Sequence, residues 1–318
     1  MKAVICTDYG PPEVLKFEEV EKPTPKGGEI LIKVLATSCH VGDTRIRKCD
    51  IPRLYYIPYR IFIGITKPKK GKNILGMECS GKVEAVGKDV TRLKPGDPVF
   101  ALAGFSFGAY AEYRCLPDKP KEGKEERAGM VAMKPKNMSY EEAATVPAGG
   151  LTALAAMRKL KLQPGEELLI YGASGSLGVF SIQIAKHFGA KVTGVCSTAN
   201  LEMVKSLGAD EVIDYTKGDF AAGGKSYDAI YDAVYKLPGS RFKKLLKKGG
   251  RFANSHESLS IRMEDLEFLR ELIEKGELKT HIDKTYPLED IVEAHRYVDK
   301  GHKRGNVAIT VARDGDSM

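Results

Sequence analysis

Short apolar stretches separated by turn residues make up the first part of the chain. They are residues 3–6, 15–20, 30–35, 81–86 and 99–102. The turns between them carry glycine and proline, as in residues 25–28 (PKGG) and 94–97 (KPGD). Strands of this length with such turns between them are typical of an all-β, barrel-like region. The pattern therefore predicts a β domain in the N-terminal part of the chain.

From about residue 141, continuous apolar stretches alternate with amphipathic ones. The predicted strands are residues 168–171, 192–196, 211–213, 228–231 and 251–254, and the predicted helices are residues 177–188, 201–207 and 264–275. The first two helices end at Gly189 and Gly208, and glycine is the residue most often found just past a helix. This alternation predicts βαβ units and a parallel, doubly wound sheet. A last apolar stretch, 307–311, is expected to return to the first domain.

We therefore expect an α/β fold with two domains. Residues 1–138, completed by 279–318, form the β domain, and residues 139–278 form the domain with the parallel sheet. A chain of 318 residues and 34.8 kDa, with 42% hydrophobic residues, is large enough for two such cores. No apolar run reaches the ~18 residues that span a bilayer, and the N-terminus lacks a signal-peptide pattern, so a cytoplasmic location is expected.

The net charge of +8 suits an anionic ligand, but its distribution argues against nucleic acid. The basic residues form short scattered groups, such as 67–72 and 243–248, with no aromatic residues interleaved in a binding motif. The six cysteines include no Cys-x-x-Cys pair, so reduced thiols are expected. The apolar stretch 54–65 is expected to pack as a helix on the β domain, and the alternative is a wall or lid for a hydrophobic acceptor.

A glycine-rich turn follows the first strand of the parallel sheet directly. It consists of Gly172, Ala173, Ser174, Gly175, Ser176, Leu177 and Gly178. Glycines in this position let the backbone turn tightly and approach a pyrophosphate, whose charge is stabilised by the N-terminus of the following helix. Because the turn stands between a strand and a helix of a βαβ unit, it predicts a dinucleotide-binding site.

The choice of dinucleotide depends on the end of the next strand, about 20 residues beyond the glycines, where an NAD-dependent enzyme carries Asp or Glu. Ser197 and Thr198 stand there instead, and their hydroxyls can bond a 2′-phosphate that a carboxylate would repel. They favour NADP(H), although Ala199 and Asn200 follow in place of a clamping arginine or lysine. Tyr215, at the end of the third strand, either covers the same phosphate or is an ordinary capping aromatic residue.

Several further motifs carry a family resemblance. They are residues 75–81 (LGMECSG), 94–100 (KPGDPVF), 182–186 (IQIAK), 207–215 (LGADEVIDY) and 293–296 (EAHR). Together with the glycine-rich turn, they resemble the medium-chain dehydrogenase/reductase superfamily, in its zinc-free quinone oxidoreductase (zeta-crystallin-like) branch. The resemblance covers nearly the whole chain. It implies a GroES-like catalytic domain for residues 1–138 and 279–318, and a Rossmann domain for residues 139–278.

The resemblance also implies a nicotinamide cofactor, which Ser197 and Thr198 indicate to be NADP(H), and transfer of hydride to a small hydrophobic quinone or α,β-unsaturated carbonyl. Further residues are then assigned to the cofactor: Asp232, Ala233, Val234, Asn254 and Asn306. Two other functions stay open, a dinucleotide-binding structural or interaction protein with little turnover and a zinc-type alcohol dehydrogenase. A homodimer is also expected, less strongly because the segment 254–263 is short where the family usually places its dimerisation strand.

In the zinc-dependent relatives three ligands hold a catalytic metal ion. The corresponding segments here are residues 40–43 (HVGD), 76–78 (GME) and 146–150 (VPAGG). Met77 and Ala148 are not zinc ligands of the usual kind, so no metal is expected. The neighbouring Cys39, His40 and Glu78 keep the zinc-type alternative open.

The expected catalytic residues are His40, Asp43 and Thr152. His40 stands where zinc-free relatives commonly have asparagine, so a titratable donor, with a pKa that can fall in the working range, replaces a neutral one. We expect His40 to bond the acceptor oxygen, where negative charge grows during hydride transfer. Asp43 either fixes the tautomer of His40 or holds the nicotinamide ribose, and Thr152 lies on the Rossmann side. The alternative is that His40 only fills its position and that water protonates the product.

Overall fold

The computed structural model describes residues 1–51, 53–257 and 260–314. The chain divides into two units. The first unit comprises Met1–Ala148, Arg262–Arg270 and Ile282–Met318, and the second comprises Gly149–Ile261 and Glu271–His281. The first division thus falls after residue 148, inside a helix, whereas the sequence pattern placed it after residue 138.

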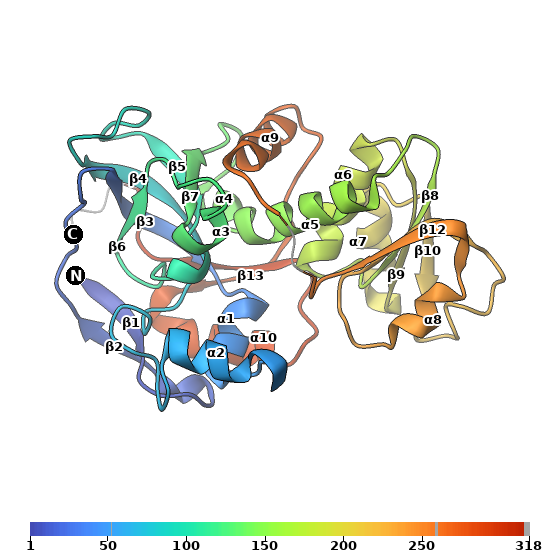
Figure 1. Ribbon diagram of the computed structural model, residues 1–318, viewed down its shortest axis with the longest axis horizontal. Helices are drawn as coiled ribbons and strands as arrows, with labels where there is room; N and C mark the ends of the chain where they lie inside the picture. Colours follow the sequence, from blue (N-terminus) through green and yellow to red (C-terminus); the bar gives the residue numbers. More distant parts are fainter. Residues whose placement is uncertain (52, 258–259, 315–318) are drawn as a thin grey trace. The chain divides into compact units, whose positions relative to one another are not determined.

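A sheet of seven strands, most of them antiparallel, dominates the first unit (Figure 1). The strand order is β13-β14-β3-β4-β5-β7, and β6 pairs with β3. These strands are β3 (Glu29–Ser38), β4 (Glu78–Val86), β5 (Pro98–Leu102), β6 (Tyr113–Pro117), β7 (Met130–Met133), β13 (Ile282–Pro287) and β14 (Asn306–Thr310), and a separate hairpin joins β1 (Lys2–Cys6) to β2 (Leu15–Glu19). β14 pairs antiparallel with β3, so the C-terminal stretch returns to the first domain as predicted.

Helices cover one part of this sheet and share a hydrophobic core with it. They are α1 (Val41–Lys48), α2 (Arg53–Ile63), α3 (Glu125–Ala128), α4 (Tyr140–Ala144) and α10 (Ile291–Asp299), with 3-10 turns η1 (Pro12–Val14), η2 (Gly104–Ser106) and η4 (Leu288–Asp290). The core joins α1, α2, α10 and β14 through the buried side chains of Ile46, Ile63, Val298 and Ile309. Burial of these aliphatic residues fixes α1, which carries two predicted site residues at its N-terminus, against the sheet.

Five parallel strands form the sheet of the second unit, in the order β10-β9-β8-β11-β12. They are β8 (Glu167–Tyr171), β9 (Lys191–Cys196), β10 (Glu211–Asp214), β11 (Tyr227–Asp232) and β12 (Leu246–Asn254), and the helices are α6 (Ser176–His187), α7 (Leu201–Ser206) and α8 (Gly239–Lys243), with a 3-10 turn η3 (Thr198–Asn200). Two further helices, α5 (Pro147–Leu160) and α9 (Met263–Glu274), include residues of both units. Numbered from β8, the order is 3-2-1-4-5, the order of a Rossmann sheet. The predicted fold class is therefore confirmed.

The central strand β8 shows why the continuous apolar stretches predicted this sheet. Leu168, Leu169 and Ile170 are completely buried, as expected for a strand with a neighbour on each side and helices on both faces. The sequence pattern missed β6, β7 and β13. Both β6 and β13 carry charged residues and are held by backbone pairing with apolar strands. Among the described residues, no helix has the length and apolar character needed to cross a membrane.

Candidate active site

The glycine-rich turn begins directly where β8 ends, in the second unit. Gly172 has a φ of +83°, a conformation that residues with a Cβ rarely adopt. A Cβ on Gly178 would lie 2.4 Å from the carbonyl oxygen of Gly172, so this glycine allows α6 to approach the turn closely. Gly175 is the N-cap of α6, and no side chain of the described residues caps this end of the helix. An uncapped helix N-terminus beside a tight turn fits a pyrophosphate.

Asn200 ties this turn to the end of β9. Its Nδ2 donates to Ser174 Oγ at 3.2 Å and to Ser197 Oγ at 3.0 Å. The Oδ1 of Asn200 is buried and has no hydrogen-bond partner among the described residues. A buried acceptor without a partner, held between two residues predicted to bind a nucleotide, fits a donor such as a ribose hydroxyl. The sequence analysis did not assign Asn200 to the site, because only an arginine or lysine was considered there as a partner for the 2′-phosphate.

Thr198 does not present a free hydroxyl as the sequence suggested. Its Oγ1 donates to Asp214 Oδ2 at 2.5 Å and lies 2.9 Å from Thr216 Oγ1. Hydrogen bonds from Thr198 and Thr216 hold the pKa of the half-buried Asp214 carboxyl below its usual range. A carboxylate therefore stands beside the residue that was expected to hold a 2′-phosphate. Asp214 directly precedes Tyr215 in the chain, but only the pairing of β10 with β9 brings it to Thr198.

The remaining predicted cofactor residues of this unit lie at or just beyond strand ends. Asp232 Oδ1 accepts the backbone N–H groups of Val234 and Tyr235, at 3.0 and 2.9 Å, so its carboxylate shapes the turn after β11. A methyl group of Val234 would lie 2.1 Å from a Cβ on Gly172, so this turn packs closely on the glycine-rich turn. Asn254, at the end of β12, accepts the backbone N–H of His256 at 2.9 Å.

Tyr215, Ala233 and Thr152 complete the predicted residues of the second unit. Tyr215 is half exposed, its backbone N–H donates to Cys196 at 3.1 Å, and its ring centroid lies 6.4 Å from that of Tyr171. Ala233 donates its N–H to Tyr171 at 3.0 Å. Thr152 lies half-buried on α5. Their roles toward a cofactor stay predictions.

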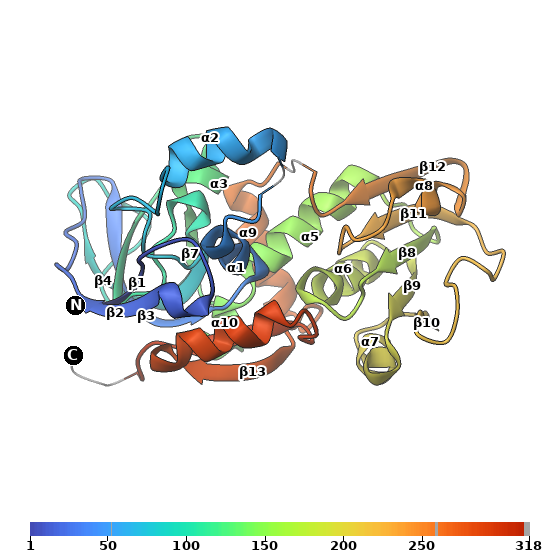
Figure 2. The ribbon, with the colours of Figure 1, turned by 90° about the horizontal axis from the view of Figure 1, so that it is seen from below.

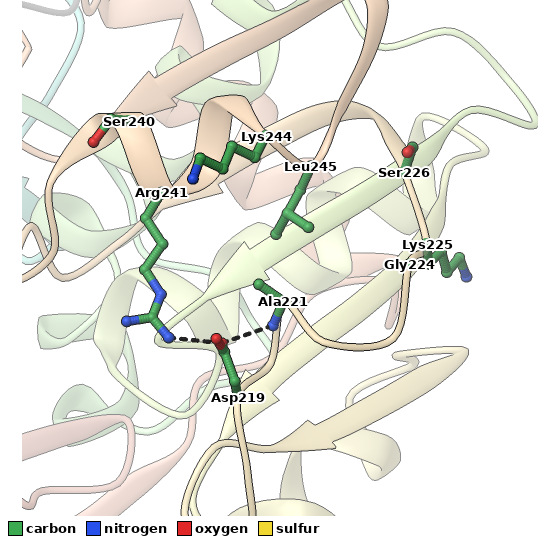
Figure 3. Close-up of a pocket in the computed structure, with 9 residues that line it drawn as sticks. All are labelled: Asp219, Ala221, Gly224, Lys225, Ser226, Ser240, Arg241, Lys244 and Leu245. Carbon is green, nitrogen blue, oxygen red and sulfur yellow. Dashed lines mark hydrogen bonds and ion pairs between the residues drawn. The ribbon is translucent and has the colours of Figure 1, made fainter.

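A pocket elsewhere in this unit does not contain the predicted nucleotide residues. Its lining residues are Asp219, Ala221, Gly224, Lys225, Ser226, Ser240, Arg241, Lys244 and Leu245 (Figure 3). Asp219 and Arg241 form an ion pair of 2.6 Å across it. Ser226 and Leu245 immediately precede β11 and β12, whereas the predicted nucleotide residues Asp232 and Asn254 end these two strands. The pocket is therefore not a candidate for the cofactor's pyrophosphate.

In the first unit, His40 is the N-cap of α1 and presents a neutral donor. Its Nδ1 accepts the backbone N–H of Gly42 at 3.0 Å, which leaves the ring proton on Nε2. Burial and the positive charges of Lys303 and Arg45 lower the pKa of His40 to about 4. The expectation that His40 titrates in the working range is therefore wrong, because a desolvated imidazole beside two cations does not take up a proton near neutral pH.

Asp43 does not fix the tautomer of His40, since Gly42 does so. The carboxylate of Asp43 instead accepts two backbone N–H groups, that of His40 at 3.2 Å and that of Gly76 at 3.0 Å. Asp43 is fully buried, and this desolvation raises its pKa to about 7. It is thus bound at both oxygens, and it positions His40 by closing a reciprocal cap at the start of α1.

Cys39, His40 and Glu78 kept the zinc-type alternative open in the sequence. In the structure each of them contacts other groups of the chain, and the three do not surround a shared vacant position. Glu78 accepts from Ser38 Oγ at one oxygen and from the N–H of Ala148 at the other, at 2.7 Å. Burial raises the pKa of the Cys39 thiol well above its usual range. Within the described ranges, no three His, Cys, Asp or Glu side chains are arranged to hold a metal ion. This donor set does not fit a catalytic zinc.

Lys303 adds a positive charge near His40 that the sequence did not point to. It lies partly buried between α10 and β14, and its Nζ donates to the carbonyl of Gly305. Burial lowers its pKa to about 8. No carboxylate of the described chain lies within ion-pair distance of it. An anion that accepts a hydrogen bond from His40 is favoured by this potential.

A buried polar network lies behind Asp43. Tyr110, which contacts Asp43 and Cys39, is completely buried, and its hydroxyl lies 3.1 Å from Nε2 of His295. Arg47 Nε donates to Nδ1 of His295 at 3.2 Å. The EAHR motif thus contributes a core histidine. Asn306, the last predicted cofactor residue, is buried at the start of β14 in this same unit, and its role stays a prediction.

Three family models match the chain. One is described as an alcohol dehydrogenase GroES-like domain and matches residues 26–155, and two are described as a zinc-binding dehydrogenase and match residues 176–255 and 253–309. A chloroplastic quinone-oxidoreductase of Triphysaria versicolor is 33% identical to this chain, over 97% of this chain and 98% of the relative. The chain belongs to the medium-chain dehydrogenase/reductase superfamily, in its quinone oxidoreductase branch.

Two further comparisons support this assignment to the medium-chain superfamily. A chloroplastic NADPH-dependent alkenal/one oxidoreductase of Arabidopsis thaliana is 30% identical, over 97% of this chain and 79% of the relative. The structure of the quinone oxidoreductase from Coxiella burnetii superposes with a TM-score of 0.81 at 27% identity, covering 98% of this chain and 99% of that one. This medium-chain reductase is accordingly an enzyme that uses a nicotinamide cofactor.

Proposed function

We propose that this enzyme uses NADPH to reduce a quinone or the conjugated double bond of an α,β-unsaturated carbonyl, without a metal ion. The observation that supports this most is the neutral Nε2–H of His40, held in place by Gly42 and Asp43. The names of the two relatives support the class of acceptor. The alternative of a cofactor-binding protein with little turnover loses its basis, because the chain belongs to a family of enzymes.

The residues of each unit have separate tasks in this proposal. The uncapped N-terminus of α6 binds the pyrophosphate, and Asn200 Oδ1 accepts a hydrogen bond from the nucleotide. A bound NADPH would supply the hydride. His40 donates its Nε2–H to the acceptor oxygen, where negative charge grows as the hydride reaches the electrophilic carbon.

The proton that completes the reduction comes from water in this scheme. The pKa of His40 is about 4, so near neutral pH the ring carries one proton only, which it shares in a hydrogen bond and does not transfer. Lys303 stabilises the growing charge through space. The two hydrogens added to the acceptor are therefore one hydride from the cofactor and one solvent proton.

The preference for NADPH rests on Ser197 and is opposed by Asp214. Ser197 Oγ accepts from Asn200 and keeps its own proton for a phosphate oxygen. The Asp214 carboxylate beside Thr198 would repel the same phosphate. We therefore propose a moderate preference for NADPH over NADH.

Steady-state oxidation of NADPH and NADH with a panel of quinones, enals and enones tests the proposal. The assay is run after dialysis against a chelator, so that a requirement for metal is detected in the same experiment. We expect turnover with at least one conjugated acceptor and none with a saturated ketone. Cofactor binding without oxidation by any member of the panel would contradict the proposed function.

A further inference from the structure

The outer side of α2 carries a row of exposed aliphatic side chains. Ile57 and Ile61 are 70% and 64% exposed, and Ile65, just beyond the helix, is 69% exposed. Ile57 and Ile61, four residues apart, lie along one side of the helix, while Tyr59, Phe62 and Ile63 on the other side pack on the core of the first unit. Figure 2 shows α2 along the outer edge of this unit. The expected packing helix is thus present, and within the described residues its side with Ile57 and Ile61 is exposed.

The chain segment that carries this row is rich in positive charge. Residues 51–77 contain six Lys or Arg and no Asp or Glu. Lys67, Lys69 and Lys70 are exposed, and Arg60 and Lys72 lie over aromatic rings at 4.6 Å from the nearest ring centroid. In the described parts of the chain none of these five cations forms an ion pair. Unlike the paired lysines of the second unit, such as Lys186 with Asp210, they remain for an external anion.

We propose that Ile57, Ile61, Ile65 and Lys67, Lys69 and Lys70, together the α2 face, dock on the surface of a bilayer that contains anionic lipids. Lysine is depleted at the centre of protein–protein interfaces, whereas aliphatic residues flanked by several lysines are typical of helices that lie in a lipid interface. Each lysine near an anionic leaflet adds a favourable electrostatic contribution. The contact is peripheral, and it does not depend on the proposed function.

Flotation of the full-length protein with vesicles tests this surface without any measurement of turnover. One vesicle population is pure phosphatidylcholine, and the other contains about 30% phosphatidylglycerol at about 0.1 M salt. We expect binding to the anionic vesicles at least about tenfold stronger than to the zwitterionic ones, and its loss at about 0.5 M salt. Equal binding to both populations, or none to either, would overturn the proposal.

Two triple substitutions with the same loss of charge separate the α2 face from the net charge of the protein. Lys67→Gln/Lys69→Gln/Lys70→Gln changes the α2 face, and Lys243→Gln/Lys244→Gln/Lys248→Gln changes exposed lysines of the second unit. The first should weaken binding to anionic vesicles on the order of 100-fold, and the second no more than about threefold. Equal effects of the two would show a general charge effect and contradict the proposal.

The aliphatic row is tested by Ile57→Ser/Ile61→Ser/Ile65→Ser. Because these side chains are already exposed, the thermal unfolding midpoint should be unchanged or higher, while vesicle binding falls at least about tenfold. Unchanged vesicle binding would overturn the role of the isoleucines. If light scattering instead shows that the parent self-associates without lipid and that this variant is monomeric, the α2 face is a contact between copies and the proposal is wrong.

Discussion

The hydroxyl of Tyr110 lies 3.1 Å from Nε2 of His295, and both side chains are completely buried. Because Arg47 Nε donates to Nδ1 of His295, the imidazole carries its proton on Nε2 and donates it to the tyrosine oxygen. Tyr110 is then free to direct its own proton toward Asp43, which caps the helix that begins at His40. The core of the first unit thus orients the candidate donor through a chain of buried hydrogen bonds.

Tyr110→Phe should lower the free energy of unfolding by about 1–3 kcal/mol, because it leaves the buried Nε2–H of His295 without a partner and removes one donor from Asp43. Tyr231→Phe is the matched control. The Tyr231 hydroxyl is also buried but has no partner among the described residues, so its removal should change stability by less than about 0.5 kcal/mol or raise it. Chemical denaturation measures both, and equal effects would contradict the network.

The second-unit fold and its glycine-rich turn were predictable because their signals are local. Leu168–Ile170 are apolar for burial on both faces of a sheet, and Gly172 is glycine because its φ is positive. The tautomer and pKa of His40 were not predictable. They depend on how its ring folds back onto Gly42 and on Lys303, which is 263 residues away in sequence and reaches His40 only through the pairing of β14 with β3.

The same limit applies to the nucleotide site. Ser197 and Thr198 could be placed at the end of a strand from spacing alone. The contacts of Asp214 with Thr198 and of Asn200 with Ser174 arise from side chains that meet across strand ends, and no periodicity in the chain encodes them. The sequence shows which hydrogen-bonding groups each side chain offers. It does not show which of these groups already bind another part of the folded chain.

The stability of Glu78→Gln relative to the parent should rise as the pH rises. Burial raises the pKa of Glu78 to about 7, above its usual value of 4.5, so ionisation in the folded state is unfavourable and the parent loses stability between about pH 5 and pH 8. The glutamine lacks this loss, and the difference in unfolding free energy should reach about 1–3 kcal/mol at the upper end. Unfolding midpoints in a pH series measure it. If the difference in unfolding free energy between the variant and the parent shrinks as the pH rises, the prediction is wrong.

Removal of metal should leave the protein unchanged. Both oxygens of Glu78 and the Nδ1 of His40 already bind groups of the chain, and Met77 and Ala148 occupy positions where the zinc-dependent relatives carry ligands. After dialysis against a chelator, we expect elemental analysis to find no stoichiometric zinc, with kcat and the unfolding midpoint as before. Tightly held zinc, together with activity that is lost on its removal and restored by its addition, would refute a metal-free mechanism.

Asp214→Asn should raise the affinity for NADPH about 3- to 10-fold and leave that for NADH nearly unchanged, because a carboxylate is removed from beside Thr198. Ser197→Asp should shift the preference toward NADH by adding one. Glu211→Gln, at the opposite end of β10, removes the same charge as a control and should alter neither affinity more than about twofold. Fluorescence titration with both cofactors gives the dissociation constants. Tighter binding of NADH than of NADPH to the parent would contradict the proposed preference.

His40 can be tested as a catalytic donor by separating hydrogen bonding from proton transfer. His40→Ala should lower kcat about 100-fold and leave the dissociation constant for NADPH unchanged, whereas His40→Asn, which restores a neutral N–H donor, should retain much of the rate. Because the pKa of His40 is about 4, the parent should show no ionisation of this residue in kcat between about pH 5.5 and pH 8. If kcat of the parent changes with pH in that range and this change is lost in His40→Asn, the imidazole transfers a proton. If His40→Ala turns over within a few-fold of the parent on its best acceptor, the residue only caps α1, and water alone stabilises and protonates the product.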